Sequence, residues 1–166
     1  MYEDIKSSLK GLLEPETNFI TNSSNFAALL FEKMDRINWV GFYMIAGESL
    51  LLGPFCGKPA CIRIDMGKGV CGSAANKRKT LVVDDVHEFP GHIACDEASE
   101  SEIVIPLIKN DKLYGVLDID SPVKSRFSFN DMKNLDELAK MLVNSSDMEA
   151  VHEFYNKMPA DISSDI

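Results

Sequence analysis

The chain has 166 residues, of which 45% are hydrophobic, and its 26 acidic and 17 basic side chains give a formal net charge of −9. This length suits one domain with a real core, and the hydrophobic fraction argues against disorder. A negative charge of this size disfavours non-specific binding to nucleic acid or to anionic membranes. No basic stretch followed by an apolar one opens the chain, so we see no secretory signal and expect a cytoplasmic protein.

The hydrophobic pattern predicts an α+β fold with a central antiparallel sheet and helices packed on it. Helical spacing of apolar residues predicts helices over residues 3–13, 17–35 and 128–144, and a short helix beginning at Val70. Alternating or β-branched runs predict strands over residues 39–45, 50–56, 61–64, 80–83, 103–109 and 113–119. We expect one domain over residues 1–148 and a C-terminal extension of unknown role over residues 149–166.

Residues 84–101 have no regular period and contain Pro90, Gly91 and two histidines. A long irregular stretch inside a compact domain is usually functional. We therefore expect this segment to carry functional side chains.

Four cysteines are too few for a disulfide scaffold in a chain of this size, so each needs its own interpretation. Cys56 stands in an apolar strand, which favours core packing. Cys71 stands at the start of a predicted helix, where the helix N-terminus lowers a thiol pKa and favours a reactive thiolate. Cys95 lies in the irregular segment among polar residues and has no obvious packing role. Cys95 is therefore the leading candidate for a reactive thiol. The local sequence does not assign a role to Cys61.

Two alternative sites have weaker support. A zinc site made of His87, His92 and Cys95, with Cys61 or Cys71 as a fourth ligand, lacks the usual ligand spacing, so we expect no metal. The run Gly-Lys-Gly-Val-Cys-Gly at 67–72 matches the dinucleotide-binding fingerprint by letter. That fingerprint requires a parallel βαβ unit, whereas this chain is predicted to be antiparallel.

Two carboxylates interrupt an apolar strand in the run Gly-Val-Leu-Asp-Ile-Asp at 115–120. Asp118 and Asp120 are two residues apart and therefore lie on one face of the strand. Two carboxylates side by side repel each other, so one of them should have a raised pKa. A solvated strand end is the alternative explanation.

Several runs taken together resemble one enzyme family, the free methionine-(R)-sulfoxide reductases. They are Gly-Pro-Phe-Cys-Gly-Lys-Pro-Ala-Cys-Ile-Arg-Ile at 53–64, the glycine-rich run at 67–72, Asp-Val-His-Glu-Phe-Pro-Gly-His-Ile-Ala-Cys-Asp at 85–96, and Ser-Glu-Ser-Glu-Ile-Val-Ile-Pro-Leu at 99–107. The resemblance spans roughly residues 2–143 and implies a single GAF domain that reduces free methionine-(R)-sulfoxide. It also suggests a homodimer.

The resemblance implies a mechanism that runs through three cysteines and needs no bound cofactor. Cys95 is the expected nucleophile, which attacks the sulfoxide sulfur and becomes a sulfenic acid. Either Cys61 or Cys71 then forms a disulfide with it, and a reductant such as thioredoxin, itself linked to NADPH, restores the thiols. Cys56 departs from the family pattern, and core packing stays its favoured role.

The same resemblance supplies a substrate pocket. Trp39 and Tyr43 correspond to the aromatic residues around the methyl-sulfur end of the substrate, although from the strand pattern alone a core role is the default. Glu102, Asp118 and Asp120 correspond to three carboxylates. We expect one of them, with Asp120 favoured, to protonate the sulfoxide oxygen, and the others to hold the ammonium group. The alternative function is a GAF sensor that binds a small ligand or a redox signal without turnover.

Overall fold

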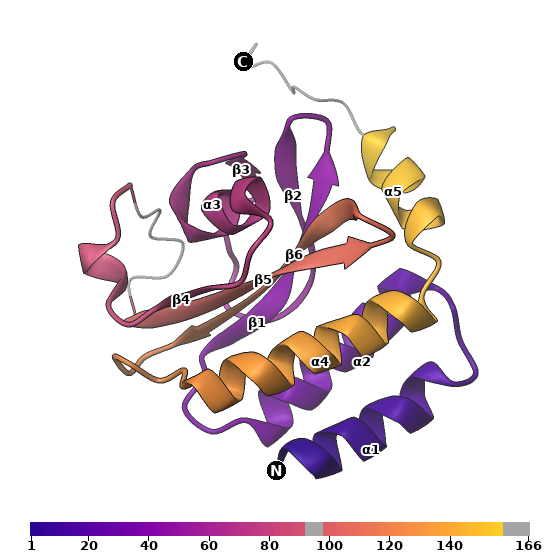
Figure 1. Ribbon diagram of the computed structural model, residues 1–166, viewed down its shortest axis with the longest axis horizontal. Coiled ribbons are helices and arrows are strands. Elements are labelled where there is room, and N and C mark those ends of the chain that lie inside the picture. The colour runs from indigo at the N-terminus through magenta and orange to yellow at the C-terminus, as the bar shows by residue number, and fades with distance from the viewer. Residues whose placement is uncertain (92–97, 158–166) are drawn as a thin grey trace.

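The computed structural model describes residues 1–91 and 98–157 and has a six-stranded antiparallel sheet with helices on both faces (Figure 1). The strand order is β3-β2-β1-β6-β5-β4. This confirms the predicted α+β class. The elements, in chain order, are α1 (Tyr2–Leu13), α2 (Phe19–Lys33), β1 (Trp39–Ala46), β2 (Ser49–Gly57), β3 (Arg63–Asp65), α3 (Gly69–Lys77), β4 (Leu81–Val83), a 3-10 turn η1 (Val86–Glu88), β5 (Ser101–Lys109), β6 (Lys112–Ser121), α4 (Phe129–Ser145) and α5 (Met148–Asn156).

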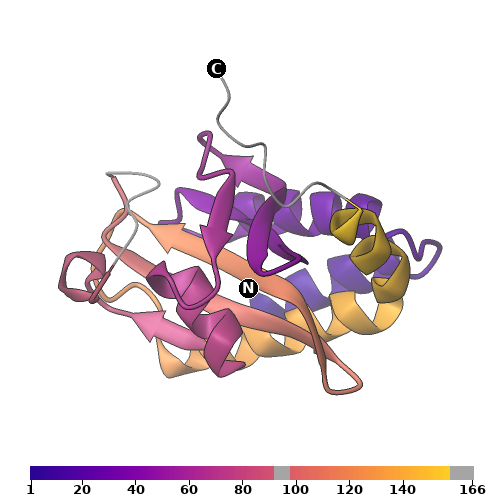
Figure 2. The ribbon, with the colours of Figure 1, turned by 90° about the horizontal axis from the view of Figure 1, so that it is seen from above.

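The main hydrophobic core lies between the sheet and helices α1, α2 and α4, where apolar residues at helical spacing meet one face of the strands. Phe42 of β1 packs edge-on against Phe19 and Phe26 of α2, each with a ring-centroid distance of 5.6 Å. Figure 2 shows α3 on the side of the sheet away from these helices. A second apolar cluster lies under α3, and the candidate site belongs to that face.

Helix α3 enters the fold through a tight glycine turn. Gly67 has φ +81°, and a Cβ on Gly72 would lie 2.3 Å from the carbonyl oxygen of Asp65. The strands before and after α3 are β3 and β4, which lie at opposite edges of an antiparallel sheet. The run at 67–72 therefore serves as a turn, and the parallel unit that the dinucleotide fingerprint requires does not form.

Two predicted boundaries change in the structure. The strand expected over residues 61–64 is β3 (Arg63–Asp65), so Cys61 lies in the irregular connection before it. The expected C-terminal extension over residues 149–166 begins inside α5, whose Met148, Val151 and Tyr155 are buried in the main core. Among the described residues, no helix is both long and apolar enough to cross a bilayer.

The β1–β2 hairpin contains an irregularity that decides which residues face α3. The pairing runs from Ala46↔Ser49 to Tyr43↔Leu52, then shifts by one residue and resumes at Gly41↔Phe55. A β-bulge reverses the alternation of side chains beyond it. Phe55 consequently lies on the α3 face, whereas Cys56 packs against the main core.

Candidate active site

Three carboxylates meet where β5 begins and β6 ends, on the face of the sheet that α3 covers. Glu102 of β5 pairs directly with Asp120 of β6, and Asp118 is two residues further along β6 on the same face. Glu102 and Asp118 are each only 6% exposed, and Asp120 is half-buried. The sheet register therefore brings together the three acids that the sequence separates by up to 18 positions.

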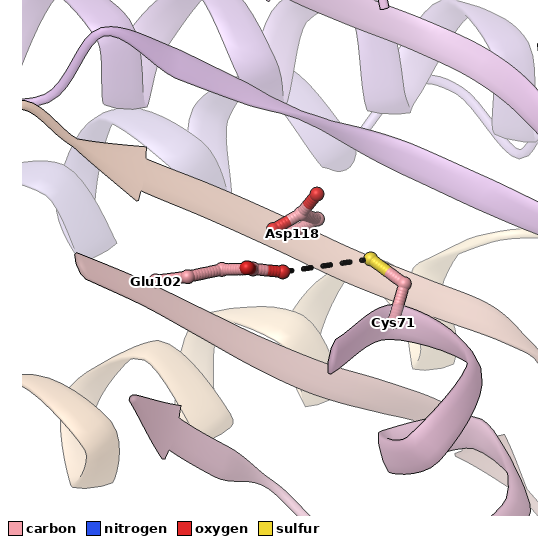
Figure 3. A group of neighbouring side chains, drawn as sticks. All are labelled: Cys71, Glu102 and Asp118. Atoms are coloured by element: carbon pink, nitrogen blue, oxygen red, sulfur yellow. Dashed lines mark hydrogen bonds between the residues drawn. The ribbon is translucent and has the colours of Figure 1, made fainter. Parts of the chain in front are cut away.

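Cys71 completes this group from above the sheet (Figure 3). It lies in the first turn of α3, and its thiol donates to Glu102 Oε1 at a sulfur–oxygen distance of 3.8 Å. One ligand atom from each of Cys71, Glu102 and Asp118 lies within 4.8 Å of the other two. Asp118 Oδ1 is buried and has no hydrogen-bond partner among the described residues. The site thus places two buried acids and a buried thiol in contact.

Burial sets the protonation states of this group. Burial is the main cause that raises the pKa of Asp118, to about 6. Burial, followed by the negative charge of Asp118, holds the pKa of Glu102 well above its ordinary range. A proton therefore stays on this pair near neutral pH, which is the state a general acid requires.

The surroundings of Cys71 oppose the reactive thiolate that its place at a helix N-terminus favours. Burial and the charges of Asp118 and Glu102 raise the pKa of the Cys71 thiol well above its ordinary value. A helix N-terminus lowers a thiol pKa only by a modest amount, and here two buried acids oppose it. Cys71 is consequently a neutral hydrogen-bond donor at neutral pH.

An aromatic stack borders the carboxylates. The Trp39 ring stacks with the rings of Tyr43 and Phe55, at centroid distances of 6.0 Å and 5.4 Å. Two glycines leave the space for it. A Cβ on Gly41 would lie 2.5 Å from the Trp39 ring, and a Cβ on Gly57 would also lie 2.5 Å from it. The sheet therefore holds a flat apolar surface directly beside the acids.

Trp39 and Tyr43 also donate hydrogen bonds to the connection between β2 and β3. Trp39 Nε1 donates to the carbonyl oxygen of Lys58 at 3.1 Å, and the Tyr43 hydroxyl donates to the carbonyl oxygen of Cys61 at 2.9 Å. Cys61 is disulfide-bonded, whereas Cys56 and Cys71 are free thiols. Cys95 and His92, the other predicted reactive or ligating residues, lie outside the described residues.

The zinc alternative receives no support from the described residues. His87 and Cys71, two of its ligands, belong to two different groups of side chains. His87 is grouped with Asp85 and Glu100, and the ammonium nitrogen of Lys124 lies 2.5 Å from Asp85 Oδ2. A lysine that forms an ion pair with a carboxylate competes with a metal ion for that carboxylate.

Comparison with known proteins agrees with this geometry. The GAF domain family profile matches residues 23–142. The free methionine-R-sulfoxide reductase of Escherichia coli is 47% identical over 141 residues, which cover 85% of this chain and 86% of that protein. The chain belongs to the GAF-domain family of free methionine-R-sulfoxide reductases.

Solved structures extend this family assignment. The free methionine-R-sulfoxide reductase of Neisseria meningitidis, in complex with its substrate, is 41% identical, has a TM-score of 0.85, and the match covers 92% of this chain and 91% of that one. A putative GAF sensor protein from Burkholderia vietnamiensis is 51% identical, has a TM-score of 0.84, and the match covers 87% and 92%.

The sequence predicted Trp39, Tyr43 and the three acids as candidate site residues. It did not predict Phe55, or the two glycines that leave space for the Trp39 ring. Gly53 and Pro54 were the available signal, because proline cannot donate to a sheet ladder and Gly-Pro within a strand marks a bulge. Recognising this bulge would have placed Phe55, rather than Cys56, beside Trp39.

Proposed function

We propose that this reductase acts on free methionine-(R)-sulfoxide and that its three carboxylates select for the free amino acid. The buried Glu102–Asp118 pair with the half-buried Asp120 beside it carries this proposal, because such a group needs a cation and the ammonium of a free amino acid supplies one. The adjoining stack of Trp39 on Tyr43 suits the methyl-sulfur end.

The proposed chemistry begins with attack by the Cys95 thiolate on the sulfoxide sulfur. The oxygen passes to Cys95, methionine leaves with its sulfur reduced by two electrons, and Cys95 becomes a sulfenic acid. A sulfoxide reacts poorly until its oxygen is protonated, so the reaction needs a nearby acid.

We assign the proton to the Glu102–Asp118 pair, in place of the earlier preference for Asp120. The raised pKa values of Glu102 and Asp118 support this assignment, since both groups hold a proton at higher pH than an ordinary carboxyl. Asp120 is half-buried at the end of the same row and is proposed to contact the substrate ammonium.

Of the two candidate resolving thiols, we favour Cys61. Its thiol condenses with the sulfenic acid: the new bond joins the two sulfurs, the sulfur–oxygen bond breaks, and water leaves with the thiol proton. The raised pKa of Cys71 and its hydrogen bond to Glu102 argue against Cys71 as the attacking thiol, and Cys61 is already disulfide-bonded. A dithiol reductant, proposed to be thioredoxin, returns the disulfide to two thiols.

A coupled assay tests the whole proposal. Purified protein, thioredoxin, thioredoxin reductase and NADPH should consume NADPH when free methionine sulfoxide is added, with the R epimer preferred. A sensor would instead bind a ligand with measurable affinity and consume no NADPH. Cys71→Ser should keep turning over, whereas Cys61→Ser should accumulate sulfenic acid. The reverse result would reassign the resolving thiol to Cys71.

A further inference from the structure

The segment that carries Cys61 is an irregular connection between two strands. Residues 58–62 join β2 to β3 without forming helix or strand, and Pro59 within them cannot donate a backbone hydrogen bond. Residues in such connections have more freedom than residues in the sheet. A thiol placed here needs an anchor if it is to meet a second sulfur within the narrow geometry of a disulfide.

Two side chains of the sheet anchor this segment at its ends. Trp39 Nε1 donates to the carbonyl oxygen of Lys58 at 3.1 Å, and the Tyr43 hydroxyl donates to the carbonyl oxygen of Cys61 itself at 2.9 Å. Both donors come from β1, a central strand of the sheet. The backbone that carries the Cys61 side chain is therefore fixed directly to the sheet.

The donors are themselves rigid. Tyr43 is 1% exposed and Trp39 is 3% exposed, and their rings stack with an interplanar angle of 25°. Burial raises the pKa of the Tyr43 phenol, so its hydroxyl stays protonated and able to donate throughout the working pH range. A donor that is buried and stacked has little freedom to move, so it fixes the position of its acceptor relative to the sheet.

We propose that Tyr43 is a positioning residue for disulfide formation, in addition to its proposed place in the substrate pocket. Its hydroxyl holds the Cys61 carbonyl so that the Cys61 thiol reaches the sulfenic acid formed by the preceding step. In this role Tyr43 acts through the backbone of Cys61 and exchanges no proton with either sulfur. This inference rests on the proposed function, because it concerns the second step of that reaction.

The substitution Tyr43→Phe tests the role, because it removes the hydroxyl and keeps the stacked ring. After mixing reduced enzyme with one equivalent of methionine sulfoxide, free methionine and the loss of thiols are followed separately by rapid quenching. In the parent protein the disulfide should follow methionine closely. In Tyr43→Phe, disulfide formation should slow about tenfold relative to methionine release, the order expected for one lost hydrogen bond. Dimedone should then trap the sulfenic acid that accumulates.

Tyr2→Phe is the matched control. Tyr2 is also buried and donates its hydroxyl to Asp131 at 2.6 Å, but it lies in α1 on the other face of the sheet. Its loss should leave the ratio of the two rates unchanged.

The outcomes separate this inference from the proposed function. If Tyr43→Phe slows methionine release and disulfide formation equally, or slows neither, the positioning role is overturned while the reductase activity stands. If the parent protein forms no methionine from the sulfoxide, the proposed function itself fails.

Discussion

Removing the charge of Asp118 should stabilise the protein in a pH-dependent way. The carboxyl is 6% exposed, and its pKa rises from 3.8 to about 6 in the folded state. At about 1.4 kcal/mol per unit of pKa, folding costs the ionised group about 3 kcal/mol. The sign follows from the direction of the shift. The penalty is absent below pH 3.8, grows between pH 3.8 and 6, and is complete above pH 6.

The substitution Asp118→Asn keeps the shape and removes the titration. We expect the variant to gain about 1–3 kcal/mol over the parent near pH 7.5, because the new amide must itself find hydrogen-bond partners in the site. For a chain of this length that gain corresponds to about 3–10 °C in Tm. Near pH 4 the difference should almost vanish. The same variant should lose about 100-fold or more in kcat/KM, because a member of the proposed proton-donating pair is gone.

Urea denaturation of the reduced protein at both pH values measures this effect. Asp35→Asn, at an exposed position, is the control and should change stability by the same small amount at each pH. The reasoning is refuted if Asp118→Asn gains equally at pH 4 and pH 7.5, or if it destabilises the protein at pH 7.5.

Three further predictions follow from the site and its frame. Cys95→Ser should abolish turnover and sulfenic acid trapping, whereas Cys56→Ser, changed on the other face of the sheet, should stay active in the coupled assay; the opposite pattern would reject the assignment of the nucleophile. N-acetylated or peptide-bound methionine sulfoxide should react far more slowly than the free amino acid, because losing the ammonium removes the cation proposed to contact Asp120 beside the buried acids, at a cost of about 1–3 kcal/mol; comparable rates would contradict the proposed pocket. Gly57→Ala should destabilise the fold by about 1–3 kcal/mol, because the new Cβ would lie 2.5 Å from the Trp39 ring and residue 57 has a φ of +136°. The same substitution should shift the fluorescence of Trp39, the only tryptophan. Gly11→Ala, with open space around the new Cβ, should not destabilise, and equal losses in both variants would show that the tryptophan slot has no special role.

Local patterns were enough to predict most of the secondary structure. The β-branched and alternating runs gave strands that became β1, β2, β5 and β6. The turn that joins β5 to β6 is formed by Asn110 and Asp111, with φ values of +49° and +64°. The strand near Cys61 was less accurate. Pro59 cannot donate to a strand ladder, and the carbonyl oxygens of Lys58 and Cys61 accept from the side chains of Trp39 and Tyr43. Such side-chain partners are invisible in a local pattern.

The pKa of the Cys71 thiol depends on more than the position of Cys71 in its helix. The sequence placed it correctly in the first turn of α3, where a lowered thiol pKa is the usual expectation. The pKa of the thiol is raised instead, because α3 lies over β5 and β6, whose acids meet the thiol in a buried site. Residues 31 and 47 positions away decide the charge of this sulfur, and no local rule contains them.

The sequence by itself determined the fold class and the placement of Asp118 and Asp120 on one strand face, and its resemblance to a family supplied the candidate residues of the proposed pocket. Only the tertiary structure decided how these groups meet. The register of β5 on β6 places Glu102 opposite Asp120, and the bulge in β2 turns Phe55 toward Trp39 and Cys56 away from it. Sequence patterns record which face of its own element a side chain occupies. The pKa values and hydrogen bonds of this site depend on desolvation and on neighbours from other elements, which exist only after the sheet and α3 have packed together.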